Sequence, residues 1–550
     1  MEPRTAPEGA RLSVEGEIPR APCALDRPEY ASIRFTPTGA VFEDLRGVPP
    51  EALRPAYEPY LGSEQPVSVV CEIRDRAAAL LRQAGYVAAV EVPEQRIADG
   101  TIRFRVLQAR LVGLRVRGDA GRAERIIAGY LGRLTEQEVF NRYEAERYLL
   151  LASDLPGYNV RLALRSAGTA RGEVIGEVTV LRTRASADLT IQNYGSRQLG
   201  RWGGLARAQL FGLTGMGDRT TLSFFTTADF DEQQTLQVAH DFRLGGEGLT
   251  IGGQFTYAWG HPDLGDPAID IRSRTLLATL EASYPFVRRQ DQTLRGTLGF
   301  DFINQDVEFN DLDLNRDRLR VAYARLDYDW VGFDPGDLRY TLIEPNWRIG
   351  ANAEFRQGLS IFDATEPCGQ GLVNCLLPGV VPPSRLEGDP TGTVLRGGVY
   401  AEYRPVPRVT FAVGLRGQYS GDPLLSFEEY SGGNYTIGRG YDPGSILGDS
   451  GVGVQIELRI GSIIPRARDD LAVEPFVFFD HSRVWNEDVL GNPGRQELSS
   501  VGGGLRAAYG DKFRLEAFIA APLQRTFLQA ERGDPRFLVS FTTRLWPWSY

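Results

Sequence analysis

The sequence has few of the side chains on which most metalloproteins and many enzymes depend. It contains only 3 histidines, 4 cysteines and 2 methionines among its 550 residues, and it has no C-x-x-C spacing. Zinc sites and redox centres draw on clusters of these side chains. We therefore expect no metal and no cofactor, and we predict that the chain is not an enzyme.

Two further deficits narrow the class of protein. No run of about 18 or more apolar residues occurs, so we expect no membrane-spanning helix. Lys512 is the only lysine, and the formal net charge is −10. Surfaces that bind nucleic acid are basic, so we expect no nucleic acid among the partners. No apolar segment follows Met1, so for an exported protein we expect this sequence to begin after a cleaved leader.

Helix-like and strand-like segments alternate in the first third of the chain, and their order repeats once. The first copy has an expected strand at 31–42, helices at 50–61 and 67–84, and strands at 87–92 and 101–107. The second copy has a strand at 111–116, helices at 122–131 and 136–151, and strands at 159–164 and 172–181. Two copies of this pattern predict two small α+β domains, preceded by an extension or linker over 1–27 without clear periodicity.

From about residue 185 onward, apolar side chains recur at every second position. Leu249, Ile251, Phe255 and Tyr257 fall on one face of an expected strand, and Gln254 falls on the other. Runs of about 9 to 14 residues with this period are long enough to cross a bilayer at a tilt. We count about 16 such runs. In lipid, only a closed barrel satisfies the backbone hydrogen bonds of so many strands.

The joins between the expected strands differ in length. Long polar joins are typical of the outer end of a membrane barrel, and short joins of the other end. The long joins lie at 260–271, 358–393 and 420–451, and two of the short ones at 405–407 and 510–511.

The residues around Arg439 form the most informative motif. In 436–444 (TIGRGYDPG) glycines bracket one arginine and one tyrosine, which permits a sharp turn. The segment resembles the R-G-Y tip of the sixth extracellular loop in POTRA-barrel outer-membrane transporters, a loop that folds back into its own barrel. A second segment, 478–482 (FFDHS), resembles their inner-wall F-x-D-x-G motif, with Ser482 in place of the final glycine. Within this superfamily the chain most resembles the two-partner secretion transporters, which export filamentous haemagglutinins and haemolysins.

This resemblance extends over nearly the whole chain and implies a fold. We expect two α+β POTRA domains at 28–109 and 110–184, followed by a transmembrane antiparallel β-barrel of about 16 strands over 185–550. The final aromatic residues are similar to the C-terminal signal of outer-membrane barrels; they are Trp546, Trp548 and Tyr550.

The resemblance also implies roles for residues of the loop and the wall. Arg439 is expected to pair with Asp480, which the alternation along its strand places inside the barrel. Gly440 permits the turn, and Tyr441 and Phe478 are expected beside the pair. An arginine can bind a carboxylate through two hydrogen bonds, so we expect this contact to lock the loop to the barrel.

An unfolded client is expected to bind the POTRA domains by β-augmentation, in which an extended chain adds a strand to an exposed sheet edge. By resemblance, the candidate edge is the second strand of each domain. Its residues are Val87, Val90 and Val92 in the first domain, and Val160 and Leu162 in the second.

An outer-membrane location also bears on the four cysteines. Extracellular loops face an oxidising compartment, so we expect a disulfide between Cys368 and Cys375 in a Pro/Gly-rich loop. Four reduced thiols are the alternative. A bond between Cys23 and Cys71 requires the N-terminal extension to lie against the first POTRA domain.

The sequence thus predicts a bacterial outer-membrane translocator that exports a large unfolded exoprotein, with its POTRA domains in the periplasm. The expected partners are the exoprotein client, outer-membrane lipid, and the barrel-assembly machinery during biogenesis. Two alternatives stay open: an insertase of the same superfamily that assembles other outer-membrane proteins, and a passive porin.

Overall fold

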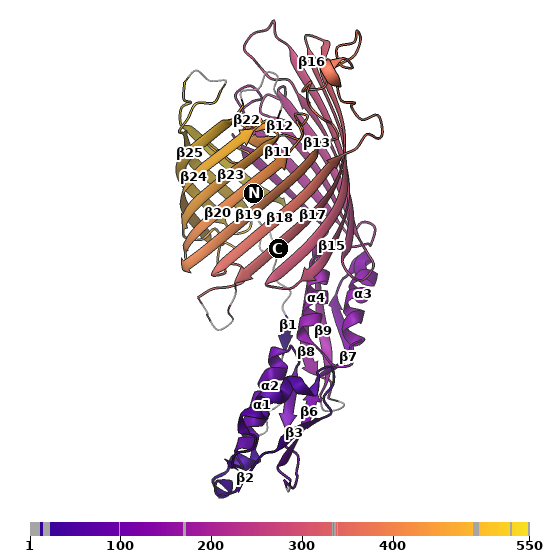
Figure 1. Cartoon of the computed structure of the whole chain (residues 1–550), viewed down its shortest axis with the longest axis vertical. Coiled ribbons are helices and arrows are strands. Elements are labelled where there is room, and N and C mark those ends of the chain that lie inside the picture. Colours follow the sequence, from indigo (N-terminus) through magenta and orange to yellow (C-terminus); the bar gives the residue numbers. More distant parts are fainter. Residues whose placement is uncertain are drawn as a thin grey trace. The chain divides into compact units, whose positions relative to one another are not determined.

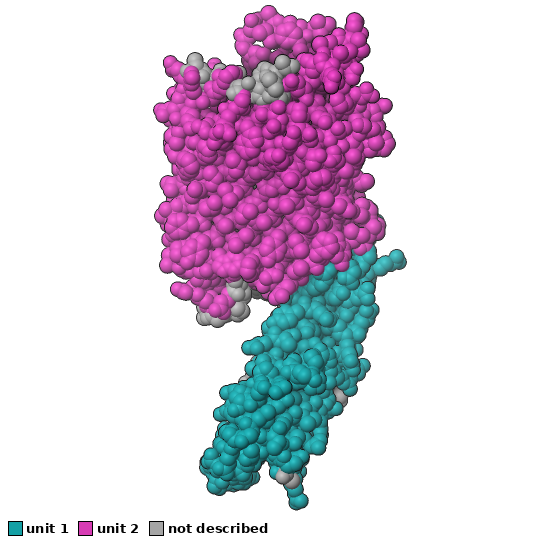
Figure 2. Space-filling model, in the orientation of Figure 1, with its two compact units in different colours: residues 1–182, 245–247 teal, residues 183–244, 248–550 magenta. Residues whose placement is uncertain are grey.

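The structure is a computed structural model of the chain. It describes residues 12–14, 23–97, 99–168, 172–332, 334, 337, 339–487, 494–527 and 531–547. Two compact units are present, one of residues 1–182 with 245–247 and one of residues 183–244 with 248–550 (Figure 2). Trp548, Tyr550 and most of the expected extension at 1–27 lie outside the described residues.

The first α+β domain packs one long helix against a three-stranded sheet (Figure 1). The sheet has the order β3-β6-β5, formed by β3 (Gly39–Glu43), β6 (Thr101–Gln108) and β5 (Ala88–Glu91). Between β3 and β5 lie the short α1 (Arg54–Tyr57) and the long α2 (Val69–Gln83). One face of α2 is buried at the spacing of successive helical turns, through Val70, Ile73, Ala77 and Leu81.

The strand expected at 31–42 is instead two short strands. β2 (Arg34–Phe35) pairs with β4 (Gln65–Pro66) in a separate small sheet, and only β3 joins the main sheet. Pro37 lies between β2 and β3 and has no backbone N–H to offer a ladder. The single expected strand is therefore wrong in this detail.

The second α+β domain has a sheet of order β1-β8-β9-β7. Its strands are β1 (Leu12–Val14), β8 (Tyr158–Ser166), β9 (Glu173–Arg182) and β7 (Arg110–Gly118), and its helices are α3 (Glu124–Thr135) and α4 (Arg142–Ser153). The helix expected at 136–151 begins six residues later, because Asn141 caps it: the Asn141 side chain accepts a hydrogen bond from the Tyr143 backbone N–H at 2.9 Å.

Hydrogen bonds between helix ends join the two α+β domains. At the C-terminal end of α2, the Gln83 carbonyl accepts from the Tyr143 hydroxyl at 3.0 Å, and the Gly85 carbonyl accepts from the Arg142 N–H at 2.8 Å. Gly85 has φ +89°, and a Cβ there would lie 2.5 Å from the Tyr143 ring. The last carbonyls of a helix need outside partners, and here the N-terminal end of α4 supplies them.

The second unit contains a closed antiparallel barrel of 16 strands. In order around the barrel they are β10 (Ala185–Gln192), β11 (Gly203–Phe211), β12 (Arg219–Thr227), β13 (Gln233–Leu244), β14 (Leu249–Gly260), β15 (Ile271–Arg288), β16 (Gln292–Phe309), β17 (Leu312–Gly332), β18 (Trp347–Gly358), β19 (Thr393–Val406), β20 (Val409–Ser420), β23 (Ser450–Ile460), β24 (Leu471–Trp485), β25 (Gln496–Tyr509), β26 (Phe513–Pro522) and β27 (Arg536–Trp546). β10 pairs with β27 and closes the ring. The predicted fold class is confirmed.

Side chains alternate between two environments along these strands. In β24, Glu474 and Asp480 are buried, whereas Val477 and Phe479 are exposed on the outer face. In β14, Phe255 is 42% exposed, as expected for a side chain that faces lipid. The three long joins lie at one end of the barrel, and the joins at 407–408 and 510–512 lie at the other. None of the helices within the described residues is both long and apolar enough to cross a membrane.

Candidate functional site

The connection between β20 and β23 packs against the inner wall of the barrel. It spans residues 421–449 and contains a short hairpin of β21 (Tyr430–Gly432) and β22 (Ile446–Gly448). The hairpin lies against β23, β24 and β25. Tyr430 is fully buried, and its ring fills the space where Gly451 of β23 has no side chain. We call residues 421–449 the infolded loop.

The structure brings Arg439 of the infolded loop together with Asp480 of β24. Nη2 of Arg439 lies 2.7 Å from Oδ1 of Asp480, and Nε lies 3.0 Å from Oδ2. The Arg439 backbone N–H also donates to Oδ2, at 2.9 Å. Arg439 is only 7% exposed and Asp480 is 0% exposed. One carboxylate therefore binds both the side chain and the backbone of the loop tip.

Two further wall residues complete the surroundings of the guanidinium. Nη1 of Arg439 pairs with Glu457 of β23, and its Cζ lies 3.5 Å above the centre of the Phe478 ring. Glu457 also accepts from Arg459 and Arg506, so the carboxylate is shared among three arginines. We did not single out Glu457 from the sequence; it is buried on the inner face of β23.

The glycines that flank Arg439 are needed for its approach to the wall. Gly438 has φ +128°, and a Cβ there would lie 2.4 Å from Cδ1 of Leu498. A Cβ on Gly440 would lie 2.8 Å from Cβ of Ser500 and 2.9 Å from the backbone N of Pro522. Any larger residue at either position would push the tip away from the wall.

Tyr441 binds the backbone near the ends of β25 and β26. Its hydroxyl lies 2.9 Å from the carbonyl oxygens of both Ser499 and Gln524, and it accepts from the Gln524 N–H at 3.0 Å. Ser482, which replaces the glycine of the family motif, is buried within β24 and bonds through Oγ to the Tyr430 hydroxyl at 3.4 Å. The strand thus accommodates serine without a break.

The structure changes the expected client-binding edges. β5 is an outer strand of its sheet, and its neighbour there is β6. Val90 has its side chain in the domain core, whereas Val87 and Val92 flank β5. β1 pairs in parallel with β8 over Leu162–Leu164, with Leu12 opposite Leu162. The chain's own strand therefore occupies the expected edge of the second domain at Leu162, whereas Val160 lies outside this pairing.

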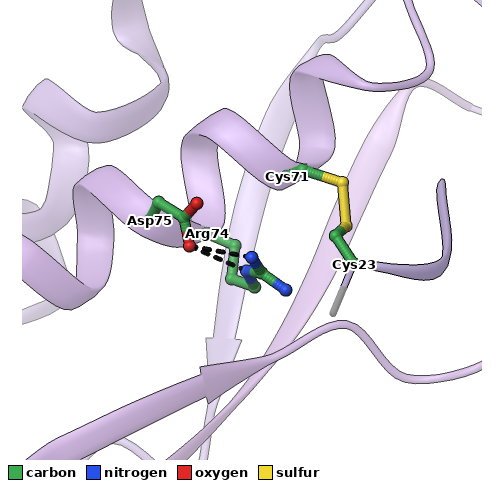
Figure 3. Close-up of a disulfide and its surroundings, with 4 residues drawn as sticks. All are labelled: Cys23, Cys71, Arg74 and Asp75. Atoms are coloured by element: carbon green, nitrogen blue, oxygen red, sulfur yellow. Dashed lines mark hydrogen bonds and ion pairs between the residues drawn. A yellow bond between two sulfur atoms is a disulfide. The ribbon is translucent and has the colours of Figure 1, made fainter. Parts of the chain in front are cut away.

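All four cysteines form disulfides, so the alternative of four free thiols is wrong. Cys368 bonds to Cys375 within the join between β18 and β19. Cys23 bonds to Cys71 of α2, and Figure 3 shows this bond with the Arg74–Asp75 ion pair on the same helix. The segment before β2 is therefore covalently attached to the first α+β domain.

Residues 178–507 match the family model of the haemolysin secretion/activation protein ShlB/FhaC/HecB, and residues 35–109 match the ShlB-type POTRA domain. The chain belongs to this family of two-partner secretion transporters. As a member, the transporter is an outer-membrane β-barrel protein that moves an exoprotein client.

Known proteins agree with this assignment. The heme/hemopexin transporter protein HuxB of Haemophilus influenzae is 20% identical over 487 residues, which cover 86% of this chain and 80% of HuxB. The solved structure of CdiB from Escherichia coli matches with a TM-score of 0.74 and 14% identity, over 96% of this chain and 94% of CdiB. CdiB from Acinetobacter baumannii matches with a TM-score of 0.65 and 14% identity, over 97% and 94% of the two chains. Both share the fold of the transporter.

Proposed function

We propose that this transporter exports a large unfolded exoprotein through its barrel, and that the infolded loop acts as the gate. The observation that carries the proposal is the buried Arg439–Asp480 pair, which fixes a loop of 29 residues (421–449) against the inner wall of a closed barrel. Lipid surrounds the barrel, and the barrel-assembly machinery inserts it. Residues 28–109 and 110–184 act in the periplasm as two POTRA domains.

Client capture in this proposal takes place at β5. In an antiparallel pair, alternate residues direct their N–H groups toward and away from the partner strand. The Ala109 N–H donates to the Val87 carbonyl at 2.7 Å, and Val87 is therefore in a hydrogen-bonded position. Ala88 and Val90 then direct their N–H groups to the outer edge. An extended client can pair with these groups through its own backbone, whatever its side chains.

The closed seam between β10 and β27 favours export over insertion of other barrels. Ile191 lies opposite Phe541 and Ala187 opposite Trp546, so pairing continues over most of β10. The Thr190 and Thr542 hydroxyls add a hydrogen bond of 2.9 Å across the seam. An insertase works through an opening at this seam, whereas an exporter works through the lumen.

The test is release of a candidate exoprotein into the medium by cells that produce both proteins. Ala88→Pro removes an outward N–H from an edge strand, where proline is tolerated. The matched control, Ala88→Val, keeps that N–H. We expect the proline variant to lose most release and the valine variant to retain it. Equal release with and without the transporter would contradict the proposed function.

A further inference from the structure

The infolded loop contacts the barrel wall at a second, separate cluster of charges. Glu428, which precedes β21, is 5% exposed. Its carboxylate accepts from Nε and Nη2 of Arg356 at 2.9 and 2.7 Å, and from Nη2 of Arg396 at 2.9 Å. Arg356 belongs to β18 and Arg396 to β19. This acidic side chain of the loop is therefore bound by two basic side chains of the wall.

The wall holds these two arginines in place. Nη2 of Arg356 also donates to Asp301 of β16 at 2.9 Å, and Arg396 donates to Gln418 of β20 at 2.8 Å. Arg396 and Gln418 both donate to the Glu428 backbone carbonyl as well, at 3.0 and 2.8 Å. Both the side chain and the main chain of Glu428 are bound, which is the same arrangement that Asp480 makes with Arg439.

Apolar contact supports this cluster. Leu425 is buried against Ile303, Leu319 and Val321 on the inner faces of β16 and β17. The next acidic residue, Glu429, pairs with Arg385 of the neighbouring join. Glu428 and Leu425 both contact the barrel wall in this part of the loop.

The two clusters have opposite polarity. At the loop tip the loop supplies a cation to the carboxylates of Asp480 and Glu457, and at Glu428 it supplies an anion to the guanidinium groups of Arg356 and Arg396. A loop position in which Glu428 faced Asp480 or Glu457 would be disfavoured, because like charges repel.

We propose that Glu428 is a second anchor and a positioning residue for the gate. When the Arg439 pair opens, the loop stays bound at Glu428 and turns about that point instead of leaving the barrel. This inference builds on the proposed gating role, but its test needs no client and can fail or succeed independently of export.

The test measures how fast a thiol reagent reaches each end of the loop in the purified full-length protein. All four native cysteines are in disulfides, so an introduced cysteine is the only free thiol. Leu425→Cys reports on the Glu428 end and Ile437→Cys on the Arg439 end, and both positions are buried. Each reporter is combined with Arg439→Ala, with Glu428→Gln, and with both.

We expect Arg439→Ala to raise the labelling rate of Ile437→Cys by about tenfold or more while Leu425→Cys stays protected, because loss of one partner of a buried pair strongly favours opening there. Glu428→Gln should release Leu425→Cys, and the double change should release both reporters. If Arg439→Ala exposes both reporters together, or if Glu428→Gln leaves Leu425→Cys protected, the second anchor does not exist.

Two additions keep the result interpretable. Glu366→Gln changes an exposed glutamate of the neighbouring join and should leave both rates unchanged. Folding of each variant is checked by heat-dependent mobility in gels. If Glu428→Gln does not fold, Arg396→Gln removes one cation of the cluster and leaves Arg356 paired with Asp301, and it carries the same expectation for Leu425→Cys.

Discussion

Arg439 binds the barrel wall through both its side chain and its backbone. Its side chain and backbone bind Asp480, its remaining amino group binds Glu457, and the Phe478 ring covers its face. At an effective dielectric near 20, one such ion pair has an attraction of about 4 kcal/mol at 4 Å before desolvation is subtracted. An attraction of this size favours the position of the loop tip against the wall.

Substitution on either side of this pair should impair secretion to a similar degree. Arg439→Ala and Asp480→Ala each remove the same contact, so we expect the double variant to be little worse than either single one, as coupled residues behave. Exoprotein in the medium is the measurement, and Glu366→Gln is the matched control. The barrel should still fold, as heat-dependent gel mobility will show. Losses that simply add would mean that the two residues act separately.

Among the strands, β14 shows most directly how the two faces of the barrel differ. Phe255 is exposed on the outer face, and its neighbour Gln254 donates to the Thr256 hydroxyl on the other face at 3.3 Å. Phe255 lies opposite Val238 of β13 and Ala278 of β15, so an apolar band continues across three strands.

Arginine should therefore be tolerated on one face of β14 and not on the other. Phe255→Arg places a charge against lipid, and we expect it to decrease the free energy of unfolding of the barrel by about 2–4 kcal/mol. Gln254→Arg places the charge toward the lumen and should cost much less. Folding into bilayers under a urea titration measures both, and equal losses would overturn the assignment of faces.

The alternation in the sequence predicted most of the barrel strands, but it did not predict the contacts of the infolded loop or the pairing of β1. Alternation in β24 and β14 placed Asp480 and Phe255 on the correct faces, because a strand has a fixed period of two. It could not find Glu428, since a loop residue has no period and its partners come from strands far away in the chain. Nor could it find the pairing of β1 with β8, because three residues carry no pattern, and main-chain pairing is nearly independent of side chains.

For the molecule as a whole, helices and tryptophans are divided between the two units. The described α-helices, α1 to α4, all lie within residues 1–182. All seven tryptophans lie beyond residue 200, in the barrel unit. Helical circular dichroism therefore reports on the N-terminal unit, and tryptophan fluorescence reports on the barrel.

The two disulfides should accordingly affect different signals. The Cys23–Cys71 bond spans 48 residues and the Cys368–Cys375 bond spans 7. From loop-closure entropy, serine at Cys23 and Cys71 should lower the stability of the N-terminal unit by about 4 kcal/mol. The measurement is the urea midpoint of helical circular dichroism. Serine at Cys368 and Cys375 is the control and should leave that midpoint unchanged; a midpoint insensitive to the first pair would show that the bond does not constrain this unit.

The hydrogen bonds between the ends of α2 and α4 have a mechanical consequence. Because the Gln83 and Gly85 carbonyls are bound by Tyr143 and Arg142, the end of one helix bears directly on the start of the next. If a client binds at β5 as proposed, a pull on that strand would reach the second domain through these hydrogen bonds as well as through the covalent chain.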